Sequence, residues 1–194
     1  HAALIGIDGK LLWDGQPLSE TKKIQELIDG ELLKVKKGWG DTAEGRKVRA
    51  TLYGKNDFGG AAALIVALPD GDEKTTLQGE LDRRYAIQKK SITELQSQGR
   101  WLDSQAACKA LLKNVGTKAE WVAELQPILL AFDTPESKVE LAADKKLEKI
   151  VKQLRDKKRD GAPKALEALL KTAANTKVGE RAQRLLTALN TPLP

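Results

Sequence analysis

The chain has 194 residues, of which 41% are hydrophobic, 31% are charged and only 4% are aromatic, a composition typical of a globular helical protein. No run of about 18 apolar residues is present, which excludes a membrane-spanning helix. A single cysteine, Cys108, excludes an internal disulfide and a CxxC redox pair. A single histidine excludes most metal sites that are built from histidines.

The net charge of +6 is unevenly distributed along the chain. Residues 134–194 hold 14 basic and 8 acidic side chains, whereas residues 1–133 hold 19 of each. An excess of positive charge in one part of a chain is compatible with an anionic partner for that part.

The first stretch of the chain predicts a β-hairpin. Two apolar runs, residues 2–7 and 11–13, flank Asp8-Gly9, and Asp-Gly between apolar runs is a strong signal for a two-residue turn. Asp tolerates a positive φ, and Gly adopts it without steric cost. The first run hardly alternates between apolar and polar residues, which predicts a strand covered on both faces.

A helix is expected to begin near Glu20, with Ser19 as its N-cap. Its apolar residues recur at i, i+3 and i+4, which places them on one face. The Gly-Trp-Gly-Asp sequence at residues 38–41 then predicts a loop. This loop is expected to separate two domains, residues 1–38 and 42–190.

The chain after residue 42 predicts a series of helices separated by turns rich in Gly, Pro and Asp. Thr117 and Pro135 mark helix starts, whereas Pro127 lies inside an apolar helical run and should kink or divide it. Short linkers between such helices are typical of antiparallel neighbours. The expected helices cover approximately residues 48–53, 58–68, 72–98, 101–112, 118–129, 136–154, 165–174 and 178–189.

Two of the expected helix starts look alike. Phe58 and Trp101 each follow a polar or glycine turn and precede small residues. The pattern resembles a degenerate tetratricopeptide-type repeat, in which small residues let paired helices approach closely. The two aromatic residues are 43 positions apart, against about 34 in that family, and a third copy near Ala165 lacks the aromatic residue. The fold class expected is mainly α, with an N-terminal β-hairpin and helix followed by an α-hairpin array.

Residues 1–37 resemble the C-terminal third of a thioredoxin-like domain, in its bacterial thiol–disulfide oxidoreductase or peroxiredoxin-like branch. The matching features are the strand at residues 3–5, the Asp8-Gly9-Lys10 turn, the strand at residues 11–13, Gly15 and the following helix. On this match His1 stands just after the cis-proline of that family. The resemblance implies a partial thioredoxin-like fold at the start of the chain.

The resemblance also implies where redox chemistry would lie. The cysteine-containing half of the family's domain has no counterpart in this sequence, so such chemistry would belong to a segment absent from it. The chain has no methionine, and we expect it to be part of a longer or processed polypeptide. Because an isolated hairpin is marginally stable in water, a protein partner or an N-terminal segment is expected to complete the sheet. The family implies a periplasmic or exported setting.

No catalytic constellation, cofactor motif or metal site is predicted from the residues present. His1 lacks the second histidine that a copper site at an amino terminus would need, and Cys108 lies on an apolar stripe as a small hydrophobe. Acidic residues are interleaved with the cations of residues 145–160, several at the i,i+3 or i,i+4 spacing of an ion pair. A solvated helix face is therefore the favoured interpretation of this stretch, and an anionic partner is the alternative. The candidate partner contacts are Trp39, between two glycines, and the basic residues Lys152, Arg155, Lys158 and Arg159.

The sequence is compatible with three functions. The first is a fragment of a thioredoxin-like protein whose helical extension is a protein-interaction scaffold. The second is a helical-repeat binding scaffold without a redox role, and the third is a basic helical module for anionic partners. Nucleic acid is the less favoured anion, because the basic stretch contains no aromatic residue for stacking and no docking motif. Whether the whole protein is an enzyme depends on a segment that would supply the cysteines.

Overall fold

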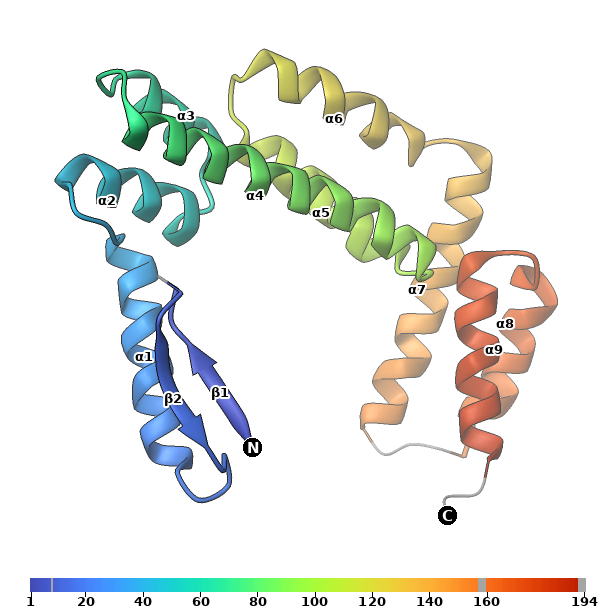
Figure 1. The fold of residues 1–194 in the computed structure, drawn as a ribbon. Helices are drawn as coiled ribbons and strands as arrows, with labels where there is room; N and C mark the ends of the chain where they lie inside the picture. Colours follow the sequence, from blue (N-terminus) through green and yellow to red (C-terminus); the bar gives the residue numbers. More distant parts are fainter. Residues whose placement is uncertain (8, 157–159, 192–194) are drawn as a thin grey trace. The chain divides into compact units, whose positions relative to one another are not determined.

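The computed structural model of the chain describes residues 1–7, 9–156 and 160–191. In this part of the chain the fold is mainly α, as predicted, with a two-stranded sheet at the N-terminus followed by helices (Figure 1). The chain forms two compact units. Unit 1 comprises His1–Tyr85 and Asn114–Lys118, and unit 2 comprises Ala86–Lys113 and Ala119–Pro194.

The domain boundary predicted at residues 38–42 lies inside unit 1. Residues 38–42 form the connection between the first helix and the second. A division of the chain there into two evolutionary domains stays a prediction.

Unit 1 begins with a hairpin of two antiparallel strands, β1 (Ala2–Ile5) and β2 (Leu11–Gly15). The register pairs Leu4 with Trp13 and then shifts at a bulge. Both strands were predicted, and their apolar, partly β-branched residues suit a pleated surface.

The turn between the strands differs from the two-residue turn that was predicted. Gly6 donates its N–H to the carbonyl of Lys10 at 2.8 Å, so the hairpin closes around three residues. Gly9 has a φ of 81°, the left-handed conformation that a three-residue hairpin loop requires near its end. Asp8, the other predicted turn residue, lies outside the described residues.

The sheet is covered on only one face. Trp13 is buried and Leu4 is half-buried, and α1 (Thr21–Lys37) runs alongside β2 (Figure 1). On the other face, Ile5 and Leu11 are 64% and 63% exposed. The prediction of a strand covered on both faces is therefore wrong for the described chain, because no element in it packs on the Ile5–Leu11 face.

The start of α1 also differs from the prediction. Ser19 donates its hydroxyl to the carbonyl of Gln16 at 2.9 Å, and Glu20 occupies the N-cap without a side-chain bond to the helix. A contact later in α1 ties it to the hairpin, because the Glu31 carboxylate accepts the N–H of Ile7 at 2.8 Å.

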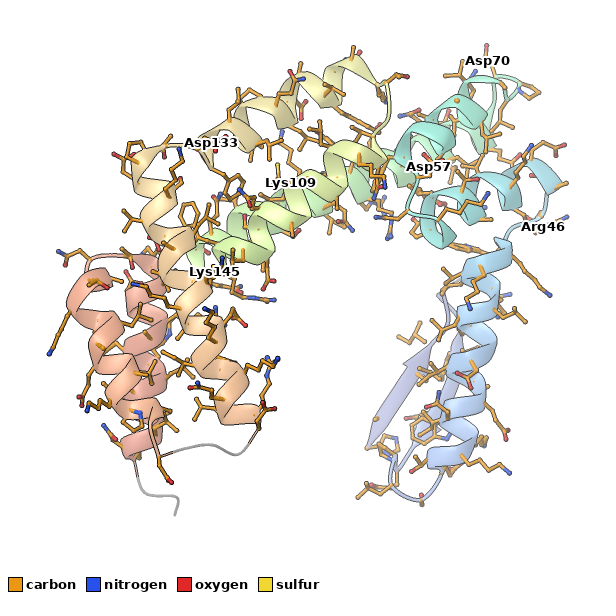
Figure 2. All side chains as sticks on the ribbon, turned by 180° about the vertical axis from the view of Figure 1, so that it is seen from behind. Arg46, Asp57, Asp70, Lys109, Asp133 and Lys145 are labelled. Carbon is orange, nitrogen blue, oxygen red and sulfur yellow. The ribbon has the colours of Figure 1, made fainter. Side chains whose placement is uncertain are left out.

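The rest of unit 1 consists of short helices that begin at capping residues. Thr42 and Asp57 accept the backbone N–H groups of Gly45 and Gly60 at 2.9 and 2.8 Å, and Asp57 is labelled in Figure 2. The helices are α2 (Ala43–Arg49), a π-helical turn η1 (Ala50–Gly54), α3 (Phe58–Val66) and the first part of α4 (Asp72–Ser97). Their buried core includes Val48, Leu52, Phe58, Ile65, Leu77, Leu81 and Val115.

Unit 2 contains the second part of α4 and two further helices, α5 (Trp101–Asn114) and α6 (Ala119–Ala131). The buried hydroxyl of Ser104 donates to the Ile92 carbonyl at 2.7 Å and joins α5 to α4. The helix α6 continues through Pro127, so the predicted division of this helix is wrong. It begins at Ala119 rather than directly after Thr117.

Three helices complete unit 2: α7 (Pro135–Arg155), α8 (Ala162–Ala173) and α9 (Lys177–Asn190). Thr134 caps α7 through the N–H of Ser137 at 3.3 Å, and Pro135 occupies the first turn, as predicted. The three helices contact one another around one apolar core. Its members include Leu147, Ile150, Leu166, Leu169, Val178, Ala182 and Leu186.

Candidate binding surfaces

The hairpin is the first candidate binding surface, since it has unpaired strand edges and an uncovered apolar face in the described chain. Its sheet has two strands in the described chain, so each strand has one unpaired edge. The uncovered face is formed by Ile5 and Leu11, which pair across the strands. An apolar face next to free backbone donors and acceptors is a surface to which an extended segment can add.

His1 lies at the start of this hairpin. Its Nε2 is 2.7 Å from Oδ1 of Asp14 on the neighbouring strand, and both side chains are exposed. An exposed pair of this kind contributes little to stability. In the described residues no group of three or more His, Cys, Asp or Glu side chains is arranged to hold a metal ion.

Trp39, a predicted partner contact, is half-buried in an aromatic and cationic stack. Its ring centroid is 4.8 Å from that of Tyr53, and the guanidinium of Arg49 lies 5.6 Å from it. Arg84 stacks on Tyr53 at 4.6 Å. Offset aromatic contacts and arginine over an aromatic face are both favourable. The stack joins the loop after α1 to η1 and α4.

The charge of Arg49 is neutralised inside unit 1. Its Nε and Nη2 contact the Glu80 carboxylate at 3.0 and 2.6 Å, and its Nη1 donates to the Trp39 carbonyl at 3.1 Å. The hydrogen bonds to Glu80 raise the pKa of Arg49, against the effect of burial. Burial is the main cause of the raised pKa of Tyr53.

A cleft of about 440 Å³ lies beside Trp39 and Arg49. Two further polar groups of the cleft bond to each other, because the Thr42 hydroxyl donates to Glu73 at 2.5 Å and accepts from the α2 backbone. Arg49 is already paired with Glu80. These groups hold α2 on α4 and leave little capacity for a ligand.

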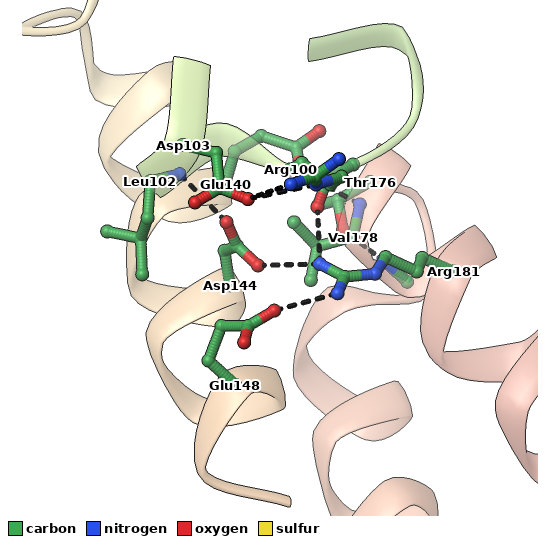
Figure 3. A network of polar contacts seen from close by, with 11 residues as sticks. Arg100, Leu102, Asp103, Glu140, Asp144, Glu148, Thr176, Val178 and Arg181 are labelled. Carbon is green, nitrogen blue, oxygen red and sulfur yellow. Dashed lines mark hydrogen bonds and ion pairs between the residues drawn. The ribbon is translucent and has the colours of Figure 1, made fainter. Parts of the chain in front are cut away.

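The acidic residues of α7 bind other parts of unit 2 (Figure 3). Asp144 accepts the N–H of Leu102 at 2.8 Å and Nη1 of Arg181 at 3.1 Å, and Glu148 accepts Nη2 of Arg181 at 2.7 Å. Glu140 accepts the N–H groups of Lys177 and Val178 at 2.8 and 3.1 Å, at the N-terminus of α9. Carboxylates stabilise a helix N-terminus because its N–H groups are unpaired.

Asp144 is buried in this network. Burial raises the pKa of its carboxyl, and the opposing effects of the Leu102 N–H and of Arg181 only partly compensate. The network is therefore a structural link between α7, α9 and the start of α5.

The cations of α7 have no acidic partner among the residues that the structure describes. Lys152 and Arg155, two predicted partner contacts, are exposed and make no ion pair with any described residue. Lys145, labelled in Figure 2, and Lys149 are also exposed and make no ion pair with a described residue. None of these cations pairs with an acid three or four positions away along the helix in the described chain. Two other predicted contacts, Lys158 and Arg159, lie outside the described residues.

A groove of about 360 Å³ lies between α7 and α8, next to this row of cations. Lys146 and Lys149 stand on the α7 side, and Ile150 and Leu169 line it as buried residues. The sequence contains no motif that indicates this groove, but two alanines three positions apart on α8 leave space there. The remaining lining residues are Gln153, Ala165, Ala168 and Thr172.

Cys108 is buried on α5, as predicted. Its thiol is 0% exposed and lies 4.0 Å from the Leu125 carbonyl. Burial raises the pKa of this thiol, and Lys109 opposes that effect. A protonated and inaccessible thiol is a structural residue, not a nucleophile.

Comparison with known proteins identifies no relative. No protein-family model, no curated protein and no solved structure matches the chain. Among the helices that the structure describes, none is both long enough and apolar enough to cross a bilayer.

Proposed function

We propose that this chain is a protein-interaction scaffold, in which the hairpin and α1 belong to a thioredoxin-like domain whose sheet is completed by a further β-segment. The observation that carries the proposal is the uncovered hairpin, with Ile5 and Leu11 exposed and an unpaired edge on each strand. Such edges pair readily with an added strand, and a two-stranded sheet alone is marginally stable.

The chemistry of the described residues supports a binding role. Cys108 is buried, and the acidic residues of the polar network in unit 2 are engaged with backbone groups and Arg181. The described surfaces thus provide contact area rather than reacting groups. By the thioredoxin resemblance, the same proposal places redox cysteines in a segment outside this sequence, in an exported or periplasmic protein.

Hydrogen exchange on two samples tests the proposal: the isolated chain, and the protein purified under native conditions from its source. In the isolated chain, we expect the amides of residues 2–5 and 11–15 to exchange with little protection, since the hairpin has one covered face. In the native protein, the added strand should slow their exchange. Equal exchange in the two samples, or strong protection already in the isolated chain, would contradict sheet completion.

A pair of variants locates the contact. The double substitution Ile5→Glu with Leu11→Glu introduces charges on the uncovered face and should remove the protection gained in the native protein. Leu18→Glu with Val66→Glu is the matched control, because it adds the same charge at residues that are 97% and 74% exposed. The control should retain the protection.

A second function, a basic helical module for anionic partners, is favoured by a different observation. The cations along α7 are exposed and lack ion pairs within the described chain, while the acids of the same helix are engaged elsewhere. The exposed cations Lys145, Lys149, Lys152 and Arg155 are therefore available to a partner.

A further inference from the structure

We infer that the groove between α7 and α8 binds an acidic amphipathic segment of a partner protein. The inference rests on the proposal that the helical region is an interaction scaffold. It concerns unit 2 alone, so it does not depend on completion of the sheet in unit 1.

The shape of the groove suits one or two apolar side chains. Ile150 and Leu169 belong to the core of the α7–α9 helices and form an apolar floor. Ala165 and Ala168 on α8 are small, so the space above this floor is not filled by the helix itself. The volume of about 360 Å³ lies at the lower end of the range for ligand sites. A short segment with leucine-sized side chains fits these dimensions better than a large ligand.

The charge of the groove selects an acidic partner. Lys146 and Lys149 are three positions apart on α7, so they lie on the same side of the helix and both line the groove. Neither makes an ion pair with a described residue, and no acid lies three or four positions from either of them along α7. Carboxylates of a partner can therefore approach these ammonium groups without displacing an existing contact. Such charge complementarity favours association and partner selection.

The remaining polar residues favour a peptide over a lipid or a nucleic acid. Gln153 makes no hydrogen bond within the described residues, and the Thr172 oxygen, whose hydroxyl donates to Leu169, is still able to accept. These groups can bond to the backbone of a bound peptide, whereas an acyl chain has no donors or acceptors for them. Nucleobases would need aromatic side chains for stacking, and none lines the groove.

Fluorescence anisotropy with a labelled peptide tests the inference on the full chain. The probe is a helical peptide of about 12 residues, roughly 18 Å long, with leucines on one face and glutamates beside them. We expect saturable binding that weakens as the salt concentration rises. Two control peptides, with Gln for every Glu or Ser for every Leu, should each bind at least about tenfold more weakly.

Three variants locate the site. Lys146→Glu with Lys149→Glu should weaken binding by about tenfold or more, and Ala168→Leu should weaken it by filling the groove without a charge change. The matched control is Lys109→Glu with Lys113→Glu, at exposed lysines of α5, and it should bind as the unaltered chain does. Circular dichroism spectra and thermal melting curves are compared for all variants to confirm that each is folded.

Several outcomes would overturn the inference. These are equal binding of the Glu and Gln peptides, absence of saturable binding up to about 1 mM, or an unchanged affinity in both groove variants. Vesicles of phosphatidylserine or a DNA duplex that bound through Lys146 and Lys149, when the peptide did not, would assign the cations to an anionic surface instead. Peptide binding to the groove should be unchanged in the Ile5→Glu with Leu11→Glu variant, even where that variant loses completion of the sheet. Failure of the two proposals can therefore be told apart.

Discussion

Arg181 on α9 and Asp144 on α7 form a buried ion pair, with Nη1 of Arg181 3.1 Å from Oδ1 of Asp144. Asp144 is 1% exposed, and its second oxygen accepts the Leu102 N–H. The pair connects segments that are 37 residues apart in the sequence. Arg181 also binds Glu148, the acid that lies three positions from Lys145 and four from Lys152 along α7, and these two lysines make no ion pair in the described chain.

Removal of the arginine should destabilise unit 2. Arg181→Met leaves the Asp144 carboxylate buried without its cation, which should cost about 3 kcal/mol in the free energy of unfolding. Urea denaturation measures the loss. Arg184→Met, at an exposed arginine of the same helix, should change the stability by less than about 0.5 kcal/mol. Equal effects of the two substitutions would show that the ion pair does not hold α9.

The pH dependence of stability should report the burial of Asp144. Its folded-state pKa is raised above the ordinary value of about 3.9, so the folded state binds the proton more tightly than the unfolded state. The stability that this carboxyl contributes is fully present below about pH 4 and is lost as the pH rises through the raised pKa. Urea midpoints measured against pH should show this decline, and Asp144→Asn should remove it. A decline that persists in Asp144→Asn would assign it to another group.

Two glycine-to-alanine substitutions should change the stability of the fold in opposite directions. Gly99 has a φ of 71°, and an added Cβ would lie 2.5 Å from the Lys177 carbonyl oxygen, so Gly99→Ala should destabilise the fold by about 2 kcal/mol. Gly79 lies inside α4, and an added Cβ there meets no atom within 4 Å. Gly79→Ala should therefore stabilise the fold by about 0.5–1 kcal/mol. Thermal melting distinguishes the two, and a stabilising Gly99→Ala would contradict the close approach.

The thiol of Cys108 should react only when unit 2 opens. Because it is fully buried and its pKa is raised, labelling by a disulfide reagent at pH 8 should be slow and should accelerate with urea. The labelling rate is followed by absorbance. Fast labelling without urea would show that the thiol is accessible in the folded protein.

The helix boundaries were the part of the fold most open to prediction. Thr134 and Pro135 mark the start of α7, and Gly99 follows the end of α4, because caps, proline and left-handed glycine act over a few residues. Predictions failed where a local signal had a competing contact. Ser19 bonds to Gln16 instead of capping α1. Of the two outcomes expected at Pro127, a kink or a division, the division is wrong because α6 is continuous there.

The candidate site was only partly accessible to prediction. The basic stretch of α7 was recognised, and its interleaved acids favoured a solvated helix face over an anionic partner. In the structure, Asp144 and Glu148 accept hydrogen bonds from Arg181, and Glu140 accepts hydrogen bonds from the backbone at the N-terminus of α9. The groove beside Lys146 and Lys149 depends on which faces of α7 and α8 meet.

The sequence by itself determined the mainly helical class, the N-terminal hairpin and most helix ends, since these follow from propensity, periodicity and capping between near neighbours. Tertiary structure alone decided that one face of the hairpin stays uncovered, that Trp39 stacks on Tyr53, and that the acids of α7 bind α9. Each of these depends on contacts between residues distant in the chain, and local patterns carry no information on the partner that a side chain meets.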